Sequence, residues 1–162
     1  MNGSFIRVLL ICLSLFCLLQ SCTPTDSVVI ENAWARPPAG SQQGTEQHDH
    51  SSMVNSSART AVYMTIHNNG ALSERLIKIT SPSADTIEIH RSWTDEKGIM
   101  RMHPLDSVEI PPEQQFIFEP GGYHLMLVGV RPLQAGDSLA LSLMFERGGA
   151  ISTSAVIGHL DR

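Results

Sequence analysis

The stretch GGYHLML, at residues 121–127, places a histidine and a methionine in alternate positions of one run. Successive side chains of a β-strand point to opposite faces, so if the aromatic and leucine residues of this run face a core, His124 and Met126 share the other face. An imidazole nitrogen and a thioether sulfur are donors for a soft or borderline metal ion. This strand therefore predicts part of a metal site on its outer face.

Two other runs offer donors of the same kind. In DTIEIHRSW, His90 is set outward together with Glu88, opposite two isoleucines, and in GIMRMH the side chains of Met100 and Met102 share a face. If these strands are neighbours, neutral imidazole and thioether ligands converge near the surface. Thioether sulfur favours Cu(I), and imidazole also binds copper, whereas zinc more often recruits cysteine or carboxylate beside histidine. The pattern favours Cu(I).

The elements that must position these residues are strands. Short alternating runs rich in β-branched and aromatic residues are separated by turn sequences such as HNNG, TDEKG, EPGG and ERGG. No window has a sustained helical stripe, so we expect an all-β fold, an antiparallel Greek-key β-sandwich or barrel. The predicted strands cover residues 27–36, 60–68, 74–80, 85–93, 98–103, 107–110, 115–119, 122–129, 137–146 and 150–157.

The 162 residues, of which 42% are hydrophobic and 17% charged, have the composition of an ordinary globular protein. One domain is expected, over residues 27–162. Within it, residues 41–59 are polar and aperiodic and are predicted to form an exposed, mobile insertion that carries His48 and His50. The formal net charge of −5 argues against nucleic acid as a partner.

The N-terminal segment has the features of an export signal. Arg7 precedes a 13-residue apolar run from Val8 to Gln20, which is too short to span a bilayer and is typical of a signal-peptide core. The following LLQSC resembles a bacterial lipoprotein cleavage site, which predicts a signal peptide over residues 1–21 and a lipid on Cys22. Residues 22–26 would then be a lipidated tether that anchors the domain to a membrane surface.

The cysteine count limits the chemistry of the mature domain. The three cysteines are Cys12, Cys17 and Cys22; the first two leave with the signal and the third carries the lipid. The mature domain would therefore have no disulfide and no thiolate ligand. A blue-copper electron carrier needs a cysteine thiolate beside two histidines, so that class is excluded.

The spacing of these residues resembles a known family. The periplasmic copper chaperones of the PCu(A)C type have the pattern H-(M)-x10-M-x21-H-x-M, and His90, Met102, His124 and Met126 match it without a gap. Arg91 stands where many members have an additional methionine. The segments ENAWAR, AVYMTIHN, EPGGYHLML and GDSLALSLMFERGG also look like family segments, so the resemblance extends over most of the mature chain.

The resemblance implies a cupredoxin-like β-sandwich that carries Cu(I) on His90, Met102, His124 and Met126. It also implies a non-enzymatic chaperone that delivers copper toward the CuA centre of cytochrome c oxidase, with Sco-type proteins or the CuA subunit as acceptors. The domain would be monomeric and periplasm-facing. Thr23 rather than aspartate follows the lipidated cysteine, which favours the outer membrane by analogy with lipoprotein sorting.

Some alternatives stay open at this point. Met100 either lines the copper site or only packs beside it. The insertion with His48 and His50 is either a solvated loop or a second, weaker site for Cu(II). The competing function is that of a metal-independent envelope lipoprotein that acts as a binding or scaffold module. Trp34, Arg36 and Tyr123 are expected to serve the fold, because large aromatic side chains bury much apolar area.

Overall fold

A computed structural model describes residues 27–38 and 58–158, and these form an all-β domain. Its ten strands are β1 (Val28–Ala35), β2 (Arg59–Asn68), β3 (Glu74–Thr80), β4 (Thr86–Thr94), β5 (Met100–Leu105), β6 (Val108–Ile110), β7 (Gln114–Phe118), β8 (Tyr123–Val128), β9 (Ser138–Phe145) and β10 (Gly149–Ile157). In the described ranges there is no helix long and apolar enough to cross a membrane.

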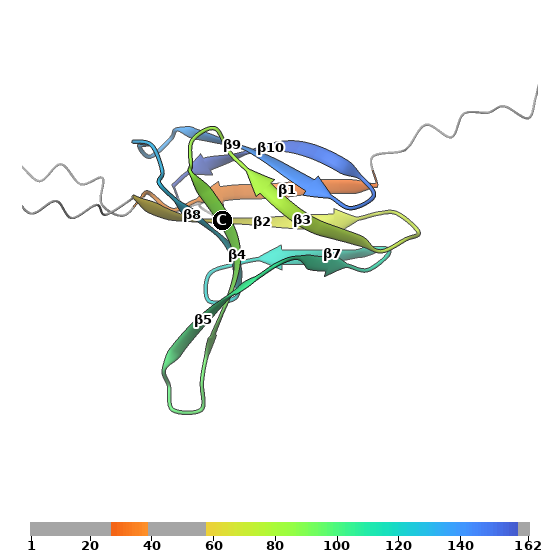
Figure 1. The fold of residues 1–162 in the computed structure, drawn as a ribbon, viewed down its shortest axis with the longest axis horizontal. Coiled ribbons are helices and arrows are strands. Elements are labelled where there is room, and N and C mark those ends of the chain that lie inside the picture. The colour runs from red at the N-terminus through yellow and green to blue at the C-terminus, as the bar shows by residue number, and fades with distance from the viewer. Residues whose placement is uncertain (1–26, 39–57, 159–162) are drawn as a thin grey trace, which may run out of the picture.

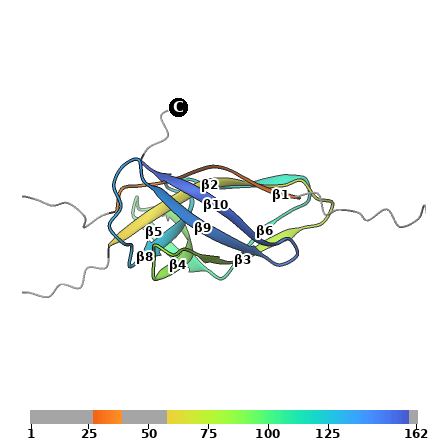
Figure 2. The same ribbon diagram turned by 90° about the horizontal axis from the view of Figure 1, so that it is seen from above.

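The strands pair in the order β5-β4-β8-β2-β1-β10-β9-β3-β6, and β7 pairs with β2 beside this path. The pairing of β1 with β10 is parallel and the other pairings are antiparallel. Figures 1 and 2 show the strands wrapped around a common interior. The order brings β4, β5 and β8, which carry the predicted metal ligands, together at one end of the sheet.

The core lies between the strands and is built from their inward-facing aliphatic side chains. Leu125 and Leu127 of β8 are fully buried in it, as the alternation of GGYHLML predicts, and Tyr123 packs partly buried against it. Burial of such side chains is the main favourable contribution to folding. The other residues of this core with no more than 1% exposure are Ala35, Val62, Ile66, Leu76, Ile110, Leu139, Leu143, Phe145, Ala155 and Ile157.

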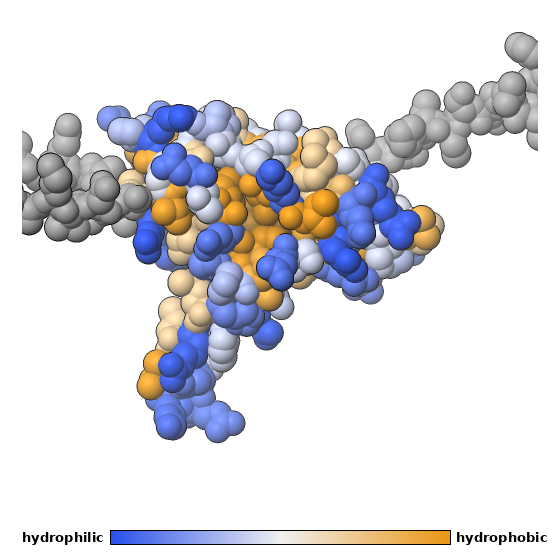
Figure 3. Space-filling view, viewed as in Figure 1, coloured by the Kyte–Doolittle hydropathy of each residue, from blue (hydrophilic) through white to orange (hydrophobic). Residues whose placement is uncertain are grey.

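A groove of about 440 Å³ with both polar and apolar lining separates β3 from β4 on the face seen in Figure 3. These two strands lie far apart in the sheet order yet run alongside one another. Isoleucines of both strands line the groove together with Leu105, and hydrophobic side chains gather at the centre of this face. The groove therefore marks where the curled sheet comes close to closing on itself.

The β4–β5 hairpin projects from the body of the sandwich (Figure 1). Asp95 holds its turn: one carboxylate oxygen accepts hydrogen bonds from the amides of Lys97 and Ile99, at 3.0 and 2.9 Å, and the other accepts one from Nε of Arg101 at 2.9 Å. Gly98 completes the turn with a positive φ of 75°, a region that favours glycine. The sequence TDEKG thus forms the turn that its residue types predict.

All ten predicted strands are present, with shifts at their ends. Two boundaries need correction. The insertion predicted over residues 41–59 is too long at its C-terminal end, because Arg59 already pairs with Val128 as the first residue of β2. The strand predicted over 98–103 occupies Met100–Leu105, because its first residues are used by the turn that Asp95 stabilises.

Candidate metal centre

The strand β4 places the four predicted ligands on one face of the sheet. It pairs with β8 along one edge and with β5 along the other. Directly opposite one another in these pairings are His90 and His124, Glu88 and Met126, and Ser92 and Met102. Opposed residues of an antiparallel pair share a face, as do residues two positions apart. The face therefore carries two imidazoles and two thioethers, as the sequence predicts.

The two histidines form the centre of this group. Their ring centroids are 5.6 Å apart and their planes meet at 77°. Both are buried, His90 at 8% and His124 at 6% exposure. The prediction that they are set outward toward solvent is therefore wrong in part: they do share one face, but the rings cover each other and His124 also lies beside Tyr63 of β2, with 6.4 Å between the ring centroids.

The two sulfurs lie on opposite sides of the histidine pair. Met126 is level with Glu88 and Met102 is level with Ser92, which are four positions apart on β4 and so about 13 Å apart along the strand. Met126 is half-buried, whereas Met102 stands on the projecting hairpin with 52% of its surface exposed. The two methionine side chains must therefore reach toward the histidines from opposite directions to share one metal ion.

Met100 lies on the same face but farther from the centre. It pairs with Thr94, the last residue of β4, and is 70% exposed. Met100 is two residues before Met102 on β5, so it lies nearer to the tip of the hairpin and farther from the histidine pair. Its register fits an accessory sulfur beyond the main site rather than a packed core residue.

Aromatic and cationic side chains border the histidine pair on the side of β2. Trp34 lies against Tyr63 with ring centroids 4.6 Å apart, and the guanidinium of Arg36 lies over the Tyr63 ring at 5.5 Å. Burial raises the pKa of Tyr63, while Arg36 acts in the opposite direction. From the sequence, Trp34 and Arg36 are expected to serve the fold, whereas Tyr63 is not singled out. Alternation around buried Val62 and Met64 signals that Tyr63 faces the other way, but only the register shows that this is the histidine face.

Hydrogen bonds orient both imidazoles. Nε2 of His90 is 2.8 Å from a carboxylate oxygen of Glu88, and its Nδ1 is buried without a hydrogen-bond partner. Nδ1 of His124 donates to the carbonyl of Gly122 at 3.3 Å. Burial lowers the pKa of His124 below its usual value of about 6.5; the Gly122 hydrogen bond opposes this shift, and repulsion from the charge of Arg36, and from that of His90 when it is protonated, adds to it. His124 is therefore held in its neutral, metal-binding form.

The donor set fits Cu(I). Two neutral imidazoles and two thioethers are soft or borderline ligands that match this ion. The buried Nδ1 of His90 has no hydrogen-bond partner, and a buried polar atom of this kind calls for one. Within the ranges that the structure describes, no three His, Cys, Asp or Glu side chains gather into a metal-binding group; the other soft donors on this face are the thioethers of Met102 and Met126.

The opposite face of the hairpin is occupied by non-ligand side chains. Arg91, at the position of the family's optional methionine, lies over the Tyr123 ring at 5.5 Å. His103 contacts Trp93 edge to face, with ring centroids 5.1 Å apart. The register pairs Arg91 with both Tyr123 and His103. The side chain at position 91 therefore points away from the face that carries the histidine pair.

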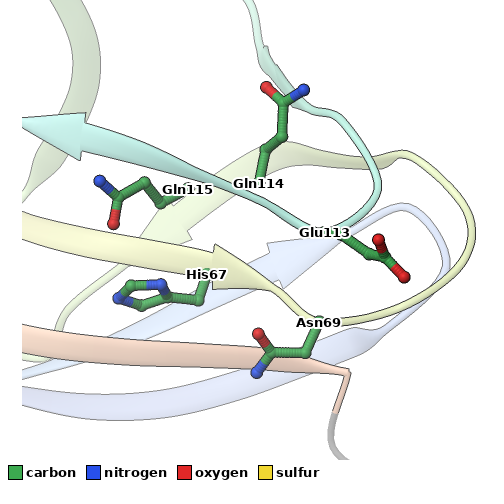
Figure 4. A pocket seen from close by; sticks show the side chains of 5 residues that line it. All are labelled: His67, Asn69, Glu113, Gln114 and Gln115. Atoms are coloured by element: carbon green, nitrogen blue, oxygen red, sulfur yellow. The ribbon is translucent and has the colours of Figure 1, made fainter.

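Another histidine lies apart from the His90–His124 pair. His67, near the end of β2, is 3.4 Å from a carboxylate oxygen of Glu31 and lines a polar pocket with Asn69, Glu113, Gln114 and Gln115 (Figure 4). This is an ordinary surface role. His48 and His50, the possible second site, and Cys22, the predicted lipid attachment point, lie outside the described residues.

Residues 28–157 match a family model described as "Putative lipoprotein LpqE-like". A curated relative, "Putative lipoprotein Lxx21020" from Leifsonia xyli subsp. xyli (strain CTCB07), is 30% identical over 101 residues, which are 62% of this chain and 59% of that protein. The chain thus spans less than two thirds of the length of this relative.

Solved structures share the fold. The apo PCuAC domain from PmoF1 superposes with a TM-score of 0.61 at 24% identity, covering 83% of this chain and 95% of that domain. The copper-bound PCuAC domain from PmoF2 gives a TM-score of 0.59 at 21% identity, with coverage of 83% and 94%. The cupredoxin-like β-sandwich is therefore confirmed, and with it the resemblance to PCu(A)C proteins at the level of the fold.

Proposed function

We propose that this chain, which belongs to the LpqE-like lipoprotein family, is a copper chaperone that binds Cu(I) through His90, Met102, His124 and Met126. The observation that carries the proposal is the buried pair of His90 and His124, with an unpartnered Nδ1 on one ring and a thioether on each side of the pair. The similarity in fold to a domain solved with copper bound supports the same reading.

The difference in exposure among the ligands suggests how copper would be passed on. The imidazoles are buried, so they would hold the ion and exclude water. Met102 is half exposed on the hairpin and neutral, so it would be the first ligand that an incoming thiolate or imidazole displaces. Stepwise exchange of this kind moves Cu(I) without releasing it and changes no covalent bond of the protein. The chain would therefore act as a carrier and not as an enzyme.

The proposal also includes the location of the protein and the acceptor of its copper. A lipid on Cys22 would hold the domain at a membrane surface facing the periplasm, with the outer membrane favoured, and the lipoprotein description of the family supports such an anchor. Sco-type proteins or the CuA subunit of cytochrome c oxidase would receive the copper. His48 and His50 would supply at most a weaker site for Cu(II).

The test is a Cu(I) titration against a chromophoric chelator under reducing conditions. The protein is the full chain in detergent with Cys12→Ser, Cys17→Ser and Cys22→Ser, called here the thiol-free chain, because thiolates would compete for Cu(I). One tight equivalent per chain is expected, lost or greatly weakened by His124→Ala or Met126→Ala.

Matched controls separate the site from general effects. His67→Ala, Met144→Leu on β9 and the pair His48→Ala with His50→Ala should leave the affinity within about twofold, since their positions are away from the histidine pair or outside the proposed main site. A wild-type protein without stoichiometric Cu(I) would instead favour the scaffold function. Transfer is tested by mixing the loaded protein with a purified CuA domain and following the copper by mass spectrometry.

A further inference from the structure

Glu88 is an acidic side chain within hydrogen-bonding distance of the candidate Cu(I) site and is not one of its proposed ligands. It stands two residues before His90 on β4 and so shares its face. Its carboxylate oxygen lies 2.8 Å from Nε2 of His90, and half of its side chain is exposed to solvent. The contact is therefore a close hydrogen bond at the edge of the buried histidine pair.

The carboxylate determines which nitrogen of His90 carries the proton. An ionised carboxylate only accepts hydrogen bonds, and a neutral imidazole has one N–H and one lone pair. Nε2 must therefore be protonated to donate to Glu88, which leaves the lone pair on Nδ1. That atom is the buried nitrogen without a hydrogen-bond partner, so the hydrogen bond on one side of the ring prepares the other side for a metal ion.

The facing histidine has the opposite arrangement. A backbone carbonyl also only accepts, so the contact of His124 Nδ1 with the Gly122 carbonyl requires a proton on Nδ1. The lone pair of His124 is then on Nε2. The two rings of the pair thus have different tautomers, one set by a side-chain carboxylate and the other by the backbone carbonyl of Gly122, just before β8 begins.

We infer that Glu88 is a positioning residue that holds His90 as the Nε2–H tautomer, so that Cu(I) binds Nδ1 of His90 and Nε2 of His124. This inference rests on the proposed Cu(I)-binding function. A carboxylate behind a metal-bound histidine fixes the ring orientation and raises the basicity of the ligating nitrogen. The ligand spacing in the sequence identifies His90 but contains no information about which of its nitrogens binds the metal.

The test compares variants of Glu88 with a second glutamate–histidine pair in the same protein. Glu31 lies 3.4 Å from Nε2 of His67 and provides the matched control. Long-range ¹H–¹⁵N NMR of the thiol-free chain reports the tautomer of each imidazole before and after Cu(I) is added. We expect a proton on Nε2 of His90 in the metal-free protein, and copper-induced shifts at Nδ1 of His90 and Nε2 of His124.

The variants test the role of the carboxylate. Glu88→Ala should give His90 a mixture of tautomers and weaken Cu(I) binding about 10–100-fold, the usual cost of losing such a partner. Glu88→Gln keeps an acceptor oxygen and should restore the tautomer and most of the affinity. Glu31→Ala should change neither. Because Glu88 is half exposed, its replacement should leave the folded state intact, which thermal unfolding checks.

The outcomes distinguish this inference from the proposed function. Tight Cu(I) binding through Nε2 of His90, or an unchanged tautomer and affinity in Glu88→Ala, would overturn the role of Glu88 and leave the copper function standing. A wild-type protein that binds no Cu(I) would overturn both. Recovery of the Nε2–H tautomer in Glu88→Gln, together with its loss in Glu88→Ala, would establish the hydrogen bond as the cause.

Discussion

His90 of β4 and His124 of β8 lie directly opposite one another in the sheet, with ring centroids 5.6 Å apart and both rings buried. This pairing brings together two residues that are 34 positions apart in the chain. It is the fixed part of the proposed copper site, because each strand is paired along both of its edges. The methionines on the same face differ in exposure: Met126 is half-buried, whereas Met102 is 52% exposed.

Met102 should matter more for Cu(I) affinity than Met100. Met102 is level with Ser92, one step along the face from His90, whereas Met100 is level with Thr94 at the end of β4. Leucine has a similar volume and no sulfur, so Met102→Leu removes a ligand with little change in packing. We expect at least a tenfold loss of Cu(I) affinity in Met102→Leu and less than threefold in Met100→Leu, measured by chelator competition. The reverse order would show that Met100 is the ligand.

The turn of the hairpin should influence the site through Met102. Asp95→Ala removes the acceptor for the amides of Lys97 and Ile99, so hydrogen exchange at these two amides should become faster. Cu(I) affinity should fall by no more than it does in Met102→Leu, and the two changes combined should be less than additive because they act on one contact. Full additivity would show that Asp95 acts on copper by another route.

Protonation of Asp95 in acid should weaken the hairpin turn and so speed amide hydrogen exchange at Ile99. Hydrogen bonding from the Ile99 amide, the largest cause, lowers the pKa of Asp95 below its usual 3.8, and Arg101 and Lys97 add to the shift. A carboxyl group with a lowered folded pKa stabilises the fold above the unfolded value and loses that contribution as the pH falls through the folded value. Exchange at Ile99, corrected for intrinsic rates, should therefore increase only below about pH 3.8. An increase already at pH 5 would contradict this assignment.

The stability of the metal-free protein should depend on His124 in mild acid. Burial lowers the folded pKa of His124, so the unfolded chain binds a proton more readily than the fold does. The free energy of unfolding should therefore decrease as the pH falls below about 6.5, and this contribution should level off below the folded pKa. Urea unfolding at pH 7.5 and 5.5, in wild type and His124→Gln, isolates the residue. A His124 contribution that stabilises the fold on acidification would have the wrong sign.

The strands could be predicted from the sequence because their signals are local. Alternation and turn residues predict β3 over 74–80 with the observed ends. Alternation also places the side chains of His124 and Leu125 on different faces of β8. The resemblance to the PCu(A)C pattern implies that all four candidate ligands belong together, and the register brings them to one face.

The burial of the histidines could not be predicted in the same way. Alternation indicates which residues share a face but not what covers that face. Tyr63 lies 61 positions before His124 in the chain, and its ring lies beside His124 only because β2 pairs with β8. The contact between Glu88 and His90 needs specific side-chain conformations, and the projection of the β4–β5 hairpin depends on the three-dimensional course of both strands (Figure 1). These features are set by strand pairing across the fold and by side-chain conformation.

The most direct test of the copper site is X-ray absorption spectroscopy at the copper edge on the thiol-free chain loaded with one Cu(I). We expect a shell of two imidazole nitrogens together with thioether sulfur, with the sulfur contribution reduced in both Met102→Leu and Met126→Leu and unchanged in Met144→Leu. A copper environment without sulfur, or one with sulfur that neither variant reduces, would contradict the assignment of His90, Met102, His124 and Met126 as the ligands.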